Sequence, residues 1–232
     1  MLLYNRRKLI GGLGIGAGAL AMPVLLRAHS ADETTQRGPR EPTASQMEGP
    51  YYPYDDMPSD LDADLVRLTG MDAQAQGQVT HMTGTIWSTS GHPHAGALVE
   101  IWQCDNNGRY IHHEDTATDR ARDPGFQGYG KTLTDTDGRF RFRTIKPVSY
   151  SAVIGGREIW RAPHIHVIVS TGGVKRLTTQ LYVEGAPGNE SDMLLQQVTT
   201  PTQRAGIIRP YLPGNGDEAG ALRVHYDVVV AV

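Results

Sequence analysis

Short runs in which apolar and polar residues alternate dominate the chain from Val79 onward. In the clearest run, Phe140 and Phe142 alternate with arginines, so the two aromatic side chains would share one face of a strand. Such alternation is typical of a strand with one buried face. Six segments fit a strand pattern of this kind: Val79–Trp87, Ala97–Cys104, Arg139–Ile145, His164–Ser170, Leu177–Val183 and Leu222–Val230.

Turn sequences rich in glycine, asparagine and aspartate separate these runs, as at residues 106–108 and 135–138. Short strands joined by such turns favour antiparallel neighbours in two packed sheets. Only residues 193–205 look helical, and residues 111–129 lack a period and exceed ordinary connection length, which indicates a functional loop. The pattern therefore predicts an all-β protein, an antiparallel β-sandwich with long active-site loops and little helix.

The first thirty-one residues differ in kind from the rest. Arg6, Arg7 and Lys8 precede an apolar, glycine-rich stretch that ends near Leu26, and small residues follow. This layout predicts an export signal over residues 1–31, and the paired arginines resemble a twin-arginine signal. A membrane anchor is the alternative, but the stretch is short and interrupted by Pro23. We expect cleavage, no stable membrane insertion afterwards, and a periplasmic or extracellular protein.

Composition narrows the possible functions. Of 232 residues, 39% are hydrophobic and 20% charged, which suits one globular domain; we assign residues 47–232 to it and residues 32–46 to a linker or arm. The net charge of -3 and the lack of a basic run give no electrostatic indication of nucleic-acid binding, so we expect none. Cys104 is the single cysteine, so no intramolecular disulfide can form.

Candidate chemistry concentrates in a few histidines and tyrosines. His164 and His166 stand two apart on a predicted strand, so both project to one face and can converge on one metal ion. No carboxylate or cysteine accompanies them in a matching pattern, whereas Tyr110 and Tyr150 each follow a strand and its turn. Taken alone, the tyrosines could be packed aromatics and the histidines zinc ligands.

Five separated segments together resemble the intradiol ring-cleavage dioxygenases. They occur in that family's order between about Gln46 and Val183, and the likeness is greatest to the protocatechuate 3,4-dioxygenase catalytic domain. The segments are Glu48–Tyr52, Ala97–Tyr110, Thr144–Tyr150, Arg161–Val167 and Thr179–Tyr182.

The resemblance implies a β-sandwich enzyme with one non-heme Fe(III) per active site. It places the metal ligands at Tyr110, Tyr150, His164 and His166, and gives catalytic roles to Tyr150, Arg161 and Gln180. Ferric iron is a hard cation that favours anionic oxygen, which suits two phenolates. The implied substrates are a catechol-type diol and O2, and the products are of the cis,cis-muconic acid type.

Several questions stay open at this stage. The sequence does not choose among catechol, protocatechuate, hydroxyquinol and larger diols, and a homo-oligomer is plausible. A noncatalytic binding module of the transthyretin-like kind is one alternative, because residues 134–140 also occur in such modules. A zinc hydrolase that uses His164 and His166 is another. Bound ferric iron would discriminate the dioxygenase from both alternatives.

Overall fold

The computed structural model describes residues 38–117, 119–154, 156–216 and 218–232. The predicted export signal, residues 1–31, and the first part of the predicted arm lie outside the described residues. Strands make up most of the regular structure, and the helices are short. The strands are β1 (Val79–Ser88), β2 (Leu98–Trp102), β3 (Tyr129–Leu133), β4 (Arg139–Ile145), β5 (Tyr150–Ile154), β6 (Arg157–Arg161), β7 (His164–Thr171), β8 (Val174–Val183), β9 (Ile208–Arg209), β10 (Leu212–Pro213) and β11 (Leu222–Val230). The helices are η1 (Leu195–Gln197) and α1 (Pro201–Ile207).

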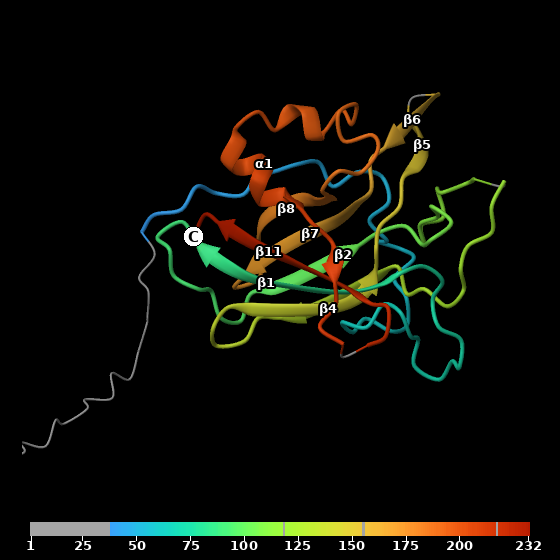
Figure 1. The fold of residues 1–232 in the computed structure, drawn as a ribbon, viewed down its shortest axis with the longest axis horizontal. Helices are drawn as coiled ribbons and strands as arrows, with labels where there is room; N and C mark the ends of the chain where they lie inside the picture. Colours follow the sequence, from blue (N-terminus) through green and yellow to red (C-terminus); the bar gives the residue numbers. More distant parts are fainter. Residues whose placement is uncertain (1–37, 118, 155, 217) are drawn as a thin grey trace, which may run out of the picture. The chain divides into compact units, whose positions relative to one another are not determined.

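Two sheets form the sandwich (Figure 1). The four-stranded sheet has the order β10-β11-β1-β4, and the five-stranded sheet has the order β3-β2-β7-β8-β9. Most neighbours are antiparallel, as the turn signals predict, but β1 pairs with β11 in parallel and β8 pairs with β9 in parallel. A parallel pair needs a long connection rather than a turn. The β1–β11 pair has one, because β1 ends at Ser88 and β11 begins only at Leu222.

The core between the sheets follows the period of two that the sequence predicts. On β4, Phe140 and Phe142 are buried, whereas Arg139 and Arg141 are exposed. Apolar residues from both sheets, such as Met82 of β1 and Val167 of β7, join one buried cluster with them. Burying such side chains is the main stabilising contribution to a fold of this kind.

A second, smaller cluster lies on the outer face of the five-stranded sheet. Because neighbouring residues of a strand point to opposite faces, Ile165 and Val167 enter the core while His164 and His166 point outward. Trp102, Tyr110 and other aromatic residues cover this outer face and are themselves buried. The long loops and the β5–β6 hairpin therefore enclose space that a bare sheet face would leave to solvent.

All six predicted strand segments are confirmed, with ends that shift by a few residues. The strand pattern missed β3, whose first residue, Tyr129, is the last residue of the predicted 111–129 loop, and it missed the β5–β6 hairpin. The helical prediction for residues 193–205 is confirmed in part, as η1 and α1. No helix among the described residues is both long and apolar enough to cross a bilayer.

Candidate metal centre

The loop after β2 positions Tyr110. Asp105 opens a tight turn in which its carboxylate accepts the backbone N–H groups of Asn107 (2.8 Å) and Arg109 (3.0 Å). Gly108 takes a positive φ of 75° there, a conformation that favours glycine. Tyr110 then donates its backbone N–H to Asp115 at 2.6 Å, and its side chain is 1% exposed. The ring of Tyr110 is thus fixed by a local hydrogen-bonded frame.

The β5–β6 hairpin positions Tyr150 and Arg161 as a cross-strand pair. Tyr150 begins β5, Arg161 ends β6, and the two stand directly opposite each other in the antiparallel register. Side chains at such positions lie on the same face of the hairpin. Both side chains are buried, so the hairpin delivers a phenol and a guanidinium to the same enclosed region.

Strand β7 supplies the two histidines on a row that crosses the five-stranded sheet. His166 pairs with Trp102 of β2 on one side and with Gln180 of β8 on the other. The Trp102 and His166 rings stack, with centroids 4.6 Å apart and planes 12° from parallel. This stacking fixes the plane of the His166 imidazole.

The four predicted ligand side chains converge on one small region. The ring centroids of Tyr110 and Tyr150 lie 5.0 Å apart, those of Tyr150 and His164 5.5 Å, and those of Tyr110 and His166 6.0 Å. The Nε2 atoms of His164 and His166 are 3.1 Å apart. Three segments, of which the first and last are more than fifty residues apart in sequence, thus bring two phenols and two imidazoles together.

The histidines are neutral and therefore have lone pairs available to a metal. Burial, and next the charge of Arg161, lower the pKa of His164 to about 3. Burial, followed by the effects of His164 and Arg161, also holds the pKa of His166 well below its usual value. The Nδ1–H of His164 donates to the carbonyl of Ala162 at 2.6 Å, which directs an unprotonated Nε2 into the site. Metal-binding histidines commonly have an outer hydrogen bond of this kind.

The tyrosines need a cation to ionise. Burial raises the pKa of Tyr110 well above 10.0, and burial also raises that of Tyr150, although the charge of Arg161 opposes the rise at Tyr150. The Tyr110 hydroxyl is fully buried and has no hydrogen-bond partner among the described residues. A buried polar atom without a partner is costly. A hard cation at this point would satisfy it and reverse the preference for the neutral phenol.

Arg161 and Gln180 lie beside the histidines and contact each other. The Nη2 of Arg161 donates to Oε1 of Gln180 at 2.5 Å, and the Nε donates to Asp192 at 2.8 Å. Gln180 is fully buried, and Arg161 is 5% exposed. The structure therefore brings all six sequence-predicted site residues, Tyr110, Tyr150, Arg161, His164, His166 and Gln180, into one buried neighbourhood.

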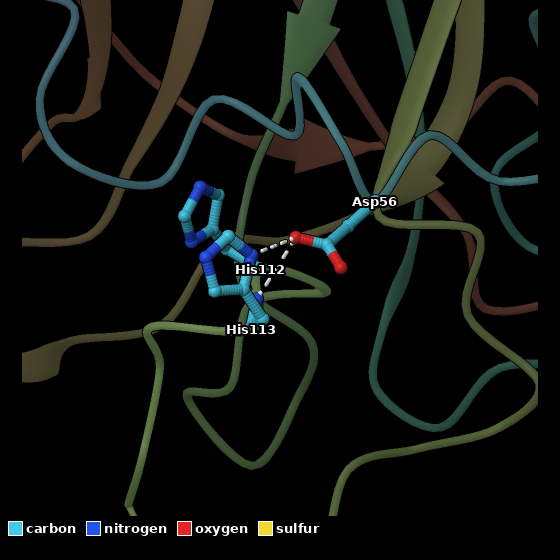
Figure 2. Close-up of side chains that lie close together, drawn as sticks. All are labelled: Asp56, His112 and His113. Atoms are coloured by element: carbon cyan, nitrogen blue, oxygen red, sulfur yellow. Dashed lines mark hydrogen bonds and ion pairs between the residues drawn. The ribbon is translucent and has the colours of Figure 1, made fainter.

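A second group of potential ligands lies nearby but fits a metal less well. Ligand atoms of Asp56, His112 and His113 lie within 4.8 Å of one another (Figure 2). Asp56 already accepts from Nδ1 of His113 (2.6 Å) and from its backbone N–H (3.0 Å), while Nδ1 of His112 accepts from the backbone of Glu114 (3.1 Å). The two imidazoles stack, so one ion could not lie in both ring planes. We interpret this group as a hydrogen-bonded link between two loops.

Sequence reasoning missed Asp192 and left Tyr51 unassigned. The Tyr51 ring packs 4.9 Å from that of Tyr110 and 6.2 Å from that of Tyr150. The Glu48–Tyr52 motif was the available signal for Tyr51. Asp192 lies two residues after Glu190 in an irregular segment, and its only signal is its position just before the helical residues 195–197.

The transthyretin-like motif belongs to a different part of the molecule. Residues 135–138 form the turn between β3 and β4, where Asp135 accepts the backbone N–H groups of Asp137 and Arg139. These bonds account for the motif as turn chemistry. The motif is therefore no evidence for a binding module.

Comparisons with known proteins point to one family. A family profile described as "Dioxygenase" matches residues 47–231. The protocatechuate 3,4-dioxygenase beta chain of Burkholderia cepacia is 33% identical, over 85% of each chain. Catechol 1,2-dioxygenase 2 of Acinetobacter lwoffii is 30% identical over 76% of this chain and 64% of its own length. The solved dioxygenase domain of a carbohydrate-binding fusion from Streptomyces sp. SirexAA-E has a TM-score of 0.56 and 28% identity, and the match covers 83% of this chain and 99% of that one.

The chain therefore belongs to the intradiol ring-cleavage dioxygenase family. It is an oxidoreductase of that class, which opens an aromatic diol between the two hydroxyl-bearing carbons. Structures of catechol and chlorocatechol 1,2-dioxygenases that are less than 25% identical share the fold, with TM-scores near 0.6. The sandwich predicted from the sequence is the architecture observed.

Proposed function

We propose that this chain holds one non-heme Fe(III) between Tyr110, Tyr150, His164 and His166 and cleaves catechol-type diols with O2. The observation that carries the proposal is that two buried phenols and two neutral imidazoles lie together in one small region. Two phenolates and two neutral imidazoles would leave a ferric centre with one net positive charge, which suits a dianionic catecholate. When bound, the iron would chelate both diol oxygens and activate the ring toward dioxygen.

The chain's own residues would manage protons and charge around the diol. The hydroxyl oxygen of Tyr150 would take one diol proton, because Arg161 stands opposite it and favours its anionic form. Arg161 would then stabilise the negative charge that develops on the ring. Gln180 and Tyr51 would line the space for the ring. The surrounding aromatic residues exclude water.

A carboxylate on the substrate would need a cation near the site. Arg109 is committed to Asp115 at 3.1 Å and to the carbonyl of Arg120 at 2.8 Å. It is therefore a structural residue of the loop that supports Tyr110.

The visible spectrum of the purified protein tests the proposal. Charge transfer from tyrosinate to iron(III) should give a red-brown protein, and anaerobic addition of catechol should shift the band because a chelating ligand replaces one phenolate. A protein that stays colourless after loading with iron(III) would contradict the metal assignment. In that case the alternative of a zinc ion bound by His164 and His166 would be favoured, because zinc gives no colour.

A further inference from the structure

We infer that Asp192 is a positioning residue that holds the Arg161 guanidinium in the orientation needed for ring cleavage. The inference rests on the proposed function, because it assumes that Arg161 faces the reacting diol. Asp192 lies in the segment between β8 and η1, thirty-one residues after Arg161 in the sequence. Its side chain is completely buried.

Asp192 engages one edge of the guanidinium. Its Oδ2 accepts from Nε of Arg161 at 2.8 Å, and its Oδ1 accepts from Nη2 at 3.3 Å. Two hydrogen bonds to one carboxylate fix the plane of a guanidinium as well as its position. The remaining nitrogen, Nη1, has no hydrogen-bond acceptor in the described part of the chain and is available to a ligand.

The backbone in turn fixes Asp192. Its Oδ1 accepts the N–H groups of Leu194 (3.1 Å) and Leu195 (3.0 Å), where η1 begins, and its Oδ2 accepts the N–H of Ala162 (3.0 Å). These bonds and the pair with Arg161 keep the carboxylate ionised despite its burial, so its pKa lies below the usual value. The Asp192 carboxylate is therefore charged, and held by several hydrogen bonds, at the pH at which the enzyme would work.

The arrangement extends from Asp192 through Arg161 to Gln180. The Oε1 of Gln180 accepts from Nη2 of Arg161 (2.5 Å) and from the hydroxyl of Tyr182 (2.8 Å). Its amide nitrogen then donates to the carbonyl of Met47 at 3.0 Å. If Asp192 were neutral, Arg161 would be a buried cation with no counter-charge beside it, and it would turn away from this arrangement.

Asp192 also has a second route to the site, and the test must separate the two. Ala162, whose N–H donates to Asp192, accepts the Nδ1–H of His164. A loss of Asp192 could therefore act on the metal ligand rather than on Arg161. A double-mutant cycle separates these routes, since an effect that passes through Arg161 must disappear when Arg161 is already replaced.

The experiment compares the iron-loaded full-length protein with Asp192→Asn, Arg161→Gln and the double variant. We expect Asp192→Asn to keep its iron and resting visible band, to lose at least about tenfold in kcat, and to change KM by less than about threefold. In the Arg161→Gln background the same change should cost less than about twofold. Unchanged kcat, or an equal loss in both backgrounds, overturns the inference.

Asp123→Asn is the matched control. Asp123 is also a buried carboxylate, 4% exposed, and accepts the backbone N–H groups of Gln76 (2.6 Å) and Gly125 (2.9 Å), but it pairs with no guanidinium among the described residues. It should lower the thermal midpoint while keeping kcat within about twofold. If Asp192→Asn does not fold, Asp192→Glu keeps the charge and displaces the oxygens; reduced kcat with an unchanged KM then supports the inference, and wild-type kcat overturns it.

The wild-type protein distinguishes failure of the proposed function from failure of the role inferred for Asp192. A colourless, inactive wild type overturns the proposed function and this inference together. A coloured, active wild type whose cycle is additive overturns the role of Asp192 alone.

Discussion

The two tyrosines at the centre are not equivalent, and their surroundings indicate which one would leave the metal. Tyr110 is held through its backbone by Asp115 and is packed against Tyr51. Tyr150 stands opposite Arg161, whose charge lowers the pKa of that phenol against the effect of burial. The negative charge of a phenolate that is not bound to the metal would thus be stabilised better at Tyr150 than at Tyr110.

Replacing Tyr150 with phenylalanine should separate metal binding from substrate binding. Tyr110, His164 and His166 would still hold iron, so we expect near-normal iron content with a weaker visible band. The acceptor for one diol proton would be lost, so the rate of anaerobic catechol binding, followed by stopped-flow absorbance, should fall at least about tenfold. Unchanged binding and turnover would contradict the role of Tyr150.

Tyr211→Phe serves as the control for that experiment. It also removes a tyrosine hydroxyl. The Tyr211 side chain, however, packs against the core between the sheets and not on the outer face of the five-stranded sheet. Iron content, visible band and catechol binding should all stay at wild-type values.

The sequence could predict a site residue only where a local pattern or motif marked that residue. His164 and His166 are readable because a strand places alternate residues on one face, and the tyrosines because ordered motifs surround them. Asp192 acts through a bond to Arg161, across thirty-one residues and an irregular segment. No local period links such a pair, so its partner could be found only in three dimensions.

Elements were predictable in proportion to the regularity of their burial. β4 has one buried and one exposed face, and its limits match the prediction. The β5–β6 hairpin carries Val153 and Trp160, which are 72% and 64% exposed, so its apolar residues do not mark a buried face. The hairpin is defined by the pairing between its two strands and by the residues that it contributes to the site. Neither feature can be seen in the sequence pattern of apolar and polar residues.

At the level of elements, close packing of β1 against its neighbours predicts a sensitive position at Gly84. A Cβ there would lie 2.0 Å from the carbonyl oxygen of Tyr226 on β11 and 2.5 Å from the ring of Phe140 on β4. Gly84→Ala should therefore lower the free energy of unfolding by at least about 2 kcal/mol, as measured by urea titration. Wild-type stability would show that β1 can shift within its sheet.

Gly206→Ala is the matched control for Gly84→Ala. Gly206 lies in α1, and a Cβ there would meet nothing within 4 Å. Alanine loses less conformational freedom on folding than glycine does, so this variant should gain about 0.5 to 1 kcal/mol in the same titration.

An ion-pair network ties the loop before β11 to β4 and should make stability depend on pH. Arg143 donates to Glu218 at 2.6 Å and to Asp64 at 2.9 Å. The bond from Arg143 lowers the pKa of Glu218 below its ordinary value of 4.5. A lowered pKa in the folded state means that the stabilisation is present above the unfolded value and is lost as pH falls through the folded one.

Glu218→Gln should thus reduce stability near pH 7 by up to about 1 kcal/mol, with the difference from wild type closing below about pH 4.5. Urea midpoints at several pH values would measure this. Glu184→Gln, at an exposed carboxylate that forms no ion pair among the described residues, should show no such pH-dependent gap. A constant gap for Glu218→Gln at all pH values would contradict the electrostatic explanation.

At the scale of the whole molecule, the export signal predicted for residues 1–31 is a testable proposal. Fused to a reporter that is fluorescent only when folded before export, these residues should direct it out of the cytoplasm. Changing Arg6 and Arg7 to lysine together should abolish that transfer, because the paired arginines are the feature that a twin-arginine route reads. Continued export of the double variant would point to another route.

The parallel pairing of β1 with β11 also has a consequence for how the protein is made. β11 lies between β10 and β1 in its sheet, and its side chains Val224, Tyr226, Val228 and Val230 belong to the main core. β1 cannot gain this neighbour until residues Leu222–Val230 have left the ribosome. Contacts of such long sequence separation form slowly. Because domains generally fold as units, the sandwich closes only after β11 has been synthesised, and a chain that stops before Leu222 lacks the strand that lies between β10 and β1.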